Sequence, residues 1–281
     1  LRFQPDAGFD FATARSKAAY WRGVFKPTGT QRDHCFRALL CLYCRTWKQL
    51  RRRIKLKLKI SIIIPVLNEA EKIADVLQPL QVLRKCGHEI ILVDGQSEDQ
   101  TCNIARKYID KLLVSAKGRA HQQLTGVKVA AGDIYLFLHA DTLLPANAES
   151  LIQQAVTNGY AWGRFNVKLS GQQWSLRIIE YAMNLRSCLT GIATGDQAIF
   201  VTRDLYQTAG GLPDIALMED IEFSNRLRSF AKPYCCKKPV LTSSRRWEQQ
   251  GIIKTVLLMW SLRLQYFFGV KPDKLVKKYY S

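Results

Sequence analysis

Short apolar runs alternate with amphipathic stretches from residue 60 onward, and this alternation restricts the fold more than any other feature of the chain. The apolar runs lie at residues 60–64, 89–93, 112–114 and 134–138. Helical spacing of apolar residues occurs after the first run at Ile73, Val76, Leu77, Leu80 and Leu83, and further helical stretches reach Ile104 and cover residues 119–131. Apolar strands separated by helices are typical of a parallel sheet covered on both faces. We therefore predict an α/β fold with a mainly parallel sheet.

Two polar residues before helical stretches have the spacing of a capping box. Asn68 precedes Glu71 by three residues, and Ser97 precedes Gln100 by three residues. In such a box the first side chain accepts a hydrogen bond from the start of the helix. The pattern predicts that Asn68 and Ser97 cap the helices after the first two strands.

Polar groups follow three of the apolar runs. Asn68 and Glu69 come after the first run, Asp94 ends the second, and His139 and Asp141 end the fourth. One such group is often only a helix cap or a turn former. Ligands of parallel α/β sheets bind beyond the carboxyl ends of the strands, however, and three groups at that edge indicate a site.

The residues at this edge favour a metal-bound diphosphate over other nucleotide sites. No G-x-G-x-x-G follows the first strand and the chain has no P-loop motif, which argues against the usual NAD, FAD and P-loop sites. Mg²⁺ takes one or two carboxylates and completes its shell with phosphate oxygens and water. Asp141 suits that role, and His139 either shifts the preference toward Mn²⁺ or hydrogen-bonds a phosphate. We expect Mg²⁺ or Mn²⁺ as cofactor.

The basic charge is concentrated at the start of the chain. The net charge is +19, and residues 1–60 hold 15 Lys and Arg against 3 Asp and Glu without a sustained apolar period. We predict a disordered basic tail over residues 1–58, which alternatively lies on anionic lipid or nucleic acid, and a single domain over residues 59–281. Cys41 and Cys44 have zinc-ligand spacing, but no second such pair completes a site.

Four motifs in order resemble those of a family-2 glycosyltransferase with the GT-A fold. They are residues 61–69, residues 91–101, His139-Ala140-Asp141 and Met218-Glu219-Asp220. The resemblance covers about residues 59–281 and implies a GT-A (Rossmann-like), mainly parallel sheet flanked by helices. The His-Ala-Asp element is similar to that of a small subgroup that includes 4,4'-diaponeurosporenoate glycosyltransferase-like proteins.

The resemblance also assigns the donor and metal side of the site. It implies that the nucleotide is bound by Pro65, Asn68, Glu69, Asp94, Lys117 and Arg119. The basic residues among them have a physical reason, since they offset diphosphate charge. Asp141 corresponds to the metal-binding acid of the family's Asp-x-Asp motif, and His139 replaces its first acid.

The catalytic and acceptor residues follow in the same way. Asp220 takes the position of the catalytic base, with Glu219 beside it, although acids at a helix start are also simple caps. The resemblance implies acceptor or diphosphate contacts for Asp196, Gln197, Arg246 and Trp247. Residues 243–247 resemble the Q-x-x-R-W element of processive relatives, but Ser243 replaces the Gln. Alternatively Arg246 and Trp247 form a packing or cation–π pair.

Residues 252–270 are apolar and aromatic, with charges at Lys254 and Arg263, and four lysines follow them. The interior charges argue against a membrane span. The pattern indicates a C-terminal amphipathic helix at a membrane interface, or a helix packed on the core.

These features predict a cytoplasmic, inverting, metal-dependent glycosyltransferase that contacts the inner face of the cell membrane peripherally. The expected partners are a nucleoside diphosphate sugar and a hydroxyl or carboxyl acceptor, lipophilic (a carotenoid or other lipid) or a saccharide. A polyprenyl-phosphate sugar synthase is the alternative of the same class. A sugar-nucleotide pyrophosphorylase needs a glycine-rich basic loop that residues 65–72 lack. A non-catalytic nucleotide- or nucleic-acid-binding protein fits the charge, but nucleic acid is not expected because the excess lies in the tail.

Overall fold

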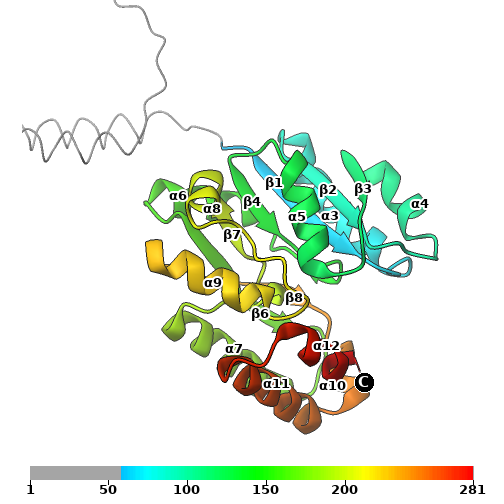
Figure 1. Ribbon diagram of the computed structural model, residues 1–281. Helices are drawn as coiled ribbons and strands as arrows, with labels where there is room; N and C mark the ends of the chain where they lie inside the picture. Colours follow the sequence, from blue (N-terminus) through cyan, green and yellow to red (C-terminus); the bar gives the residue numbers. More distant parts are fainter. Residues whose placement is uncertain (1–57, 281) are drawn as a thin grey trace, which may run out of the picture. The chain divides into compact units, whose positions relative to one another are not determined.

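The computed structural model describes residues 58–280, so the predicted basic tail up to residue 57 and the Cys41 and Cys44 pair lie outside the described residues. The described part contains an eight-stranded sheet of order β3-β2-β1-β4-β7-β6-β8-β5 (Figure 1). Its strands are β1 (Ile60–Val66), β2 (Glu89–Asp94), β3 (Lys111–Val114), β4 (Ile134–Phe137), β5 (Thr142–Leu143), β6 (Trp162–Leu169), β7 (Phe200–Thr202) and β8 (Tyr234–Thr242).

One half of the sheet is parallel, as the sequence predicts. β1 pairs in parallel with β2 and β4, and β2 pairs in parallel with β3. The residues of β1, β2 and β4 are buried throughout, which is the burial pattern that continuous apolar runs indicate. The predicted positions of the four apolar runs are therefore confirmed.

The other half makes the sheet mixed. β7 is antiparallel to β4 and to β6, β6 is parallel to β8, and β8 is antiparallel to β5. The parallel pairs are still the more numerous, and the order of the strands changes direction between β1 and β4. That change in direction is where ligands of such sheets collect.

Helices cover both faces of the sheet because alternate strand residues point to opposite sides. Ile62 and Ile64 pack with α3 (Ile73–Lys85) and α6 (Ala148–Thr157). Ile63 packs on the other face with α5 (Arg119–Val129), α8 (Arg203–Thr208) and α9 (Glu219–Phe230). The five apolar residues predicted for the first helix are the five buried residues of α3.

The remaining helices lie between these elements and at the C-terminus. They are α4 (Thr101–Ala105), the 3₁₀ turns η1 (Arg106–Tyr108) and η2 (Gly195–Gln197), α7 (Trp174–Thr190), α10 (Arg245–Gln250), α11 (Ile252–Phe267) and α12 (Pro272–Tyr280). α11 and α12 pack through Leu262 and Leu275 onto Leu217 and Met218, just before α9. Within residues 58–280, none of the helices combines the length and apolar character needed to cross a bilayer.

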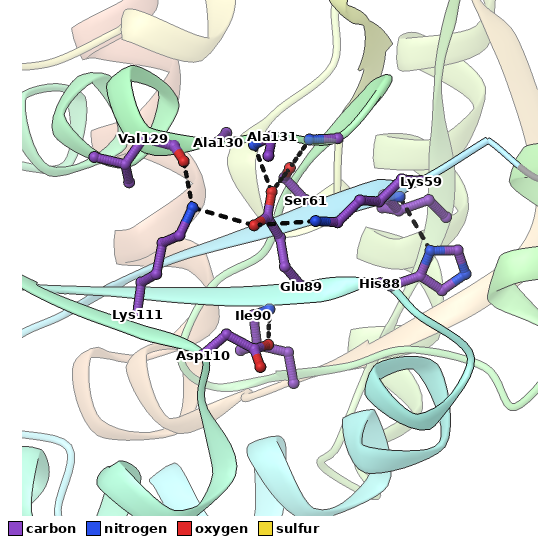
Figure 2. Close-up of polar contacts among 12 residues, drawn as sticks. Lys59, Ser61, His88, Glu89, Ile90, Asp110, Lys111, Val129, Ala130 and Ala131 are labelled. Atoms are coloured by element: carbon purple, nitrogen blue, oxygen red, sulfur yellow. Dashed lines mark hydrogen bonds and ion pairs between the residues drawn. The ribbon is translucent and has the colours of Figure 1, made fainter.

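A closed ion cluster fastens the amino ends of the parallel strands (Figure 2). Glu89 accepts hydrogen bonds from the Ser61 hydroxyl at 2.5 Å and from the Ala131 amide at 2.6 Å. Its other oxygen lies 3.5 Å from Lys59 Nζ and 3.3 Å from Lys111 Nζ. Burial works to raise the pKa of Glu89, but these hydrogen bonds outweigh it, and the pKa is lowered.

Candidate active site

Left-handed backbone is concentrated at the carboxyl edge of the sheet. The non-glycine residues with positive φ in residues 58–280 are Asn68, Gln96, Ala198 and Met218. Each is one of the predicted site residues or lies within two residues of one. This conformation costs about 1 kcal/mol for a residue with a side chain and persists where the surrounding structure enforces it, often at functional sites.

The loops after β1 and β2 are cross-linked through Asp94. Its carboxylate accepts hydrogen bonds from the Ser97 amide and, at 2.5 Å, from the Ser97 hydroxyl. The Ser97 hydroxyl accepts from the Asn68 amide at 2.9 Å, and the Asn68 side chain accepts from the Glu98 amide at 2.9 Å. The capping prediction is therefore wrong, since α3 and α4 begin after Lys72 and Gln100. Asn68 and Ser97 join two loops instead.

A glutamine that sequence reasoning missed holds the same strand ends. Gln122 on α5 is 3% exposed, and its Nε2 donates to the carbonyls of Val66 at 2.7 Å and Val93 at 2.8 Å. A Cβ on Gly95 would lie only 3.0 Å from this nitrogen, so a larger residue there would require the glutamine side chain to shift. The only sequence signal is an amide side chain in the third predicted helix. Pro65 lies in β1 itself, paired with Val93.

The basic loop before α5 connects this region to α9. Lys117 is exposed, and Gly118 has a φ of 135° at the start of the helix. Nε of Arg119 lies 3.4 Å from Oε1 of Glu219. Arg119 therefore links the predicted donor side to the predicted catalytic acids.

Asp220 and His139 meet at the turn that begins with Gly195. Oδ2 of Asp220 accepts a hydrogen bond from the Gly195 amide at 2.9 Å, and Oδ1 accepts from the Ile221 amide at 2.7 Å. The imidazole of His139 also lies against Gly195, where a Cβ would collide with Nε2 and Cε1. Any residue larger than glycine at position 195 would displace the histidine.

The electrostatic environment keeps His139 neutral. Burial lowers its pKa most, and the nearby Arg119 guanidinium lowers it further. Three carboxylates oppose this shift, those of Asp141, Asp196 and Asp220. The net lowering leaves an imidazole that can accept a hydrogen bond or ligate a metal at neutral pH.

Glu219 is a buried carboxyl with one charged partner. It is 5% exposed, and burial raises its pKa to about 7, with Arg119 opposing and Asp220 adding to the rise. Asp220 beside it is only half-buried. Two adjacent acids therefore stand in different surroundings, and Asp220 is the one that a substrate can reach.

Asp141, the predicted metal ligand, lies near enough to Glu69, a predicted nucleotide-binding residue, for its charge to act on it. Burial raises the pKa of Glu69, Arg245 opposes this, and the charge of Asp141 raises it further. Residues 58–280 contain no group of three or more His, Cys, Asp or Glu placed to hold a metal alone. A Mg²⁺ or Mn²⁺ that shares its shell with a diphosphate needs only one or two carboxylates, so the residues present fit such an ion.

Two predicted acceptor-side residues differ in their surroundings. Gln197 is fully buried, its Oε1 accepts from the Thr194 amide at 3.2 Å, and its Nε2 donates to Asn184 at 3.4 Å. It holds the Gly195 turn and is not open to a substrate, which corrects the prediction of a contact. Asp196 in the same turn is half-buried, close to His139 and Arg186.

The Arg-Arg-Trp segment on α10 is oriented differently from the prediction. The Arg246 guanidinium stacks 3.7 Å from the Tyr279 ring and donates to the Tyr279 carbonyl at 2.8 Å, so it fastens α12. Arg245 instead reaches the site edge, with Nη2 3.5 Å from Glu69 Oε1. Successive residues of a helix point about 100° apart, and here Arg245 contacts a predicted site residue whereas Arg246 contacts α12. Trp247 is half-buried on the same helix.

Comparisons with known proteins place the chain in a family and a fold. Residues 61–208, just over half of the chain, match the sequence model of glycosyl transferase family 2. A dolichol-phosphate mannosyltransferase of Pyrococcus furiosus is 29% identical over 109 residues, which make up 36% of this chain and 31% of that protein. The matched part is thus less than a third of that relative, and Glu219 and Asp220 lie beyond residue 208.

Solved structures share the fold at low identity. The mannosyltransferase PcManGT from Pyrobaculum calidifontis, in complex with GDP-Man and Mn²⁺, has a TM-score of 0.52 at 20% identity, covering 74% of this chain and 64% of that one. TarS 1–349 from S. aureus also has a TM-score of 0.52 at 20% identity, covering 67% and 61%. The predicted GT-A-like α/β fold is confirmed.

Proposed function

The chain belongs to glycosyl transferase family 2, and we propose that it moves a sugar, with inversion, from a nucleoside diphosphate sugar to a hydroxyl or carboxyl acceptor. One observation carries the proposal. The Asp220 carboxylate accepts a hydrogen bond from the Gly195 amide, and the His139 imidazole lies against the same glycine. The proposed catalytic acid and the proposed metal-site histidine therefore contact one turn.

The donor nucleotide is bound by the cross-linked loops after β1 and β2. Asn68 and Glu69 lie on the first loop and Asp94 ends β2, and the hydrogen bonds of Asn68 and Asp94 to Ser97 preorganise the edge before a ligand arrives. Arg119 and Lys117 supply positive charge for the diphosphate. Arg119 is itself oriented by the Glu219 carboxyl, which makes Glu219 a positioning residue for the diphosphate side.

Asp141 and His139 would hold a divalent ion, Mg²⁺ or Mn²⁺, together with the donor diphosphate. Such an ion neutralises the charge that develops on the departing nucleoside diphosphate. The charge repulsion between Asp141 and Glu69 supports this role, because a cation between carboxylates relieves it. The bound Mn²⁺ in the PcManGT structure supports the same assignment.

Asp220 acts as the base for a hydroxyl acceptor. It takes the hydroxyl proton as the acceptor oxygen bonds to the anomeric carbon, and the bond from that carbon to the diphosphate oxygen breaks. A carboxyl acceptor is already ionised at neutral pH and needs no base. The acceptor is proposed to be lipophilic, a carotenoid or another lipid, with a saccharide as the other choice, and the protein to be cytoplasmic with peripheral membrane contact.

Calorimetric titration of the full chain with a panel of nucleoside diphosphate sugars tests the donor side. We expect one donor to bind with Mn²⁺ or Mg²⁺, to bind less with chelator, and to lose at least about tenfold in affinity in Asp141→Ala. Asp214→Asn is the matched control, since Asp214 is exposed and paired only with His121. Failure of every donor to bind under any metal contradicts the proposal.

A polyprenyl-phosphate sugar synthase is the second candidate, favoured by the similarity to a dolichol-phosphate mannosyltransferase. A phosphate acceptor is ionised and requires no base, so Asp220→Asn should then reduce transfer only slightly. A hydroxyl acceptor predicts a large loss in the same variant. Transfer assays with a polyprenyl phosphate and with alcohol acceptors, on wild type and Asp220→Asn, separate the two candidates.

A further inference from the structure

α7 has the opposite orientation to an ordinary surface helix, which packs its apolar face on the protein and exposes its polar face. Its polar side chains face the sheet, where they bond the edge of β6 that β7 leaves unpaired. Asn184 bonds both the amide and the carbonyl of Val167, at 2.8 and 2.9 Å, and Glu180 accepts from the Leu169 amide at 2.5 Å. Arg177 donates to the Leu169 carbonyl at 2.9 Å. The polar face of α7, which would normally meet water, thus covers the free edge of β6.

The outward face of α7 is consequently apolar. Its exposed large apolar side chains are between 44% and 77% exposed, and they are Trp174, Ile178, Tyr181, Leu185 and Leu189. The spacing of four, three, four and four residues is that of one continuous stripe along a helix. Soluble proteins rarely expose contiguous apolar patches of this kind unless they bind something there.

α11 carries a second stripe of the same kind. Thr255 and Leu262 face the domain, whereas the outward side chains are between 59% and 82% exposed, and they include Ile253, Leu257, Trp260, Leu264 and Phe267. This stripe was expected from the sequence, but the stripe on α7 was not.

The two helices lie at the same end of the domain (Figure 1). Burial, and then the charge of Arg263 on α11, lower the pKa of Arg186 on α7 to about 10, so the two arginines are neighbours. Arg186 also interacts with Asp196 and Asp220. The inner side of α7, opposite its stripe, is therefore near the candidate active site.

The positive charge of residues 252–280 indicates which kind of partner binds the stripes. Residues 252–280 contain Asp273 as their only acid. The exposed lysines of this segment are Lys254, Lys271, Lys274, Lys277 and Lys278. Two copies of the chain packed through this face would bring like charges together. An anionic lipid surface instead offers both an apolar layer and the opposite charge.

We propose that α7 and α11 together form a docking surface for anionic membranes, with both helices lying in the interface. This is independent of the proposed sugar transfer, although it would present a lipid acceptor to the site. α7 makes the contact two-sided, so the domain is fixed in orientation and does not pivot on one helix.

Quenching of tryptophan fluorescence by vesicles of brominated, phosphatidylserine-containing lipid tests the proposal. The full chain has six tryptophans, and we expect Trp174→Phe and Trp260→Phe each to remove part of the quenching. A Trp174→Phe variant that is quenched as fully as wild type overturns the two-helix surface. Residues 1–57 are present in every variant, so their contribution to vesicle binding is the same throughout the comparison.

Vesicle sedimentation gives a second measurement. Two double variants should each lower partitioning of the protein onto vesicles about tenfold or more. One combines Ile178→Ser with Leu189→Ser on α7, and the other combines Leu257→Ser with Phe267→Ser on α11. Phe230→Ser is the matched control, since Phe230 is 57% exposed on α9. Unchanged partitioning of the α7 double variant contradicts the proposal. The proposal is also contradicted if the wild-type chain does not bind vesicles but forms a dimer that both double variants lose. Donor titration should be unaffected in all of them, which separates this outcome from a failure of the proposed function.

Discussion

Two buried glutamates at opposite edges of one sheet have opposite electrostatic character. Glu89 at the amino edge is surrounded by two lysines and two hydrogen-bond donors, which outweigh its burial and lower its pKa. Glu219 at the carboxyl edge has Arg119 at 3.4 Å and Asp220 beside it, and burial raises its pKa to about 7. Both side chains are about equally inaccessible to water.

The difference between the two glutamates indicates that the two edges of the sheet have different roles. At the amino edge, polar groups satisfy one another and leave nothing for a ligand, which is the arrangement of a structural network. At the carboxyl edge, carboxylates accumulate with few cationic partners, and all four left-handed non-glycine residues of the described part lie there. Unfavourable charge and backbone strain are retained where a ligand offsets them.

The largest expected effect is that of a substitution at the carboxyl edge, and it concerns activity and not stability. Asp220→Asn should reduce transfer to a hydroxyl acceptor about a thousandfold, because the base is lost, while thermal stability stays close to wild type. The measurement is released nucleoside diphosphate together with the melting temperature. Glu222→Gln on the same helix is the control, and a large loss of stability in Asp220→Asn would mean that the residue is structural.

Glu89→Ala should have the reverse profile. Removing the acid leaves Lys59, Lys111 and the Ser61 hydroxyl without their partner, at a cost of about 3 to 4 kcal/mol in free energy of unfolding. Urea denaturation measures this, with the exposed Glu98→Ala as control. Donor affinity of the folded protein should not change, and a selective loss of donor binding would remove the distinction between the two edges.

The pH dependence of stability should distinguish the two glutamates by sign. The pKa of Glu219 is raised from 4.5 to about 7, so the folded protein holds a proton that the unfolded chain has released, and stability falls as pH rises through this window. Glu219→Gln should reduce this loss in free energy of unfolding by roughly 2 to 3 kcal/mol.

The pKa of Glu89 is lowered, so its stabilisation is present above about pH 4.5 and is lost as pH falls further. Urea midpoints between about pH 2.5 and 8 for wild type, Glu219→Gln and Glu89→Gln test both signs. Parallel curves for wild type and Glu219→Gln would contradict the environment described for Glu219.

The smallest expected effect concerns Arg245, which is exposed and 3.5 Å from Glu69. Arg245→Gln should change stability by about 0.5 kcal/mol or less, since exposed ion pairs contribute little, but should weaken donor binding by about threefold through the diphosphate charge. Arg246→Gln should show the opposite balance because Arg246 holds Tyr279. Titration and urea denaturation of the two variants make the test, and equal effects would contradict it.

Local periodicity sufficed to predict the parallel half of the fold. Each apolar run became a strand, and the burial of α3 follows from its sequence alone. The convergence of Asp94, His139 and Asp141 at one edge also follows, because parallel strands end at the same side. These features depend on residues close together in the sequence.

The failures all depend on tertiary partners. Asn68 and Ser97 have capping spacing, but their hydrogen bonds go to a neighbouring loop. Arg245 and Arg246 are equivalent in sequence until the direction of α10 is known. The orientation of α7 is the clearest case, because its polar face is inward only where β6 has an unpaired edge.

The position of β5 has a consequence for synthesis of the chain. This strand, directly after Asp141, pairs only with β8, and Thr142 bonds Thr242 across 100 residues at 2.9 Å. At about 5 to 20 residues per second, the ribosome needs roughly 5 to 20 s to deliver the partner. During that time the parallel half can fold, but the segment that carries His139 and Asp141 has no strand to anchor it. The loop that carries His139 and Asp141 is therefore among the last parts of a nascent chain to acquire its final shape.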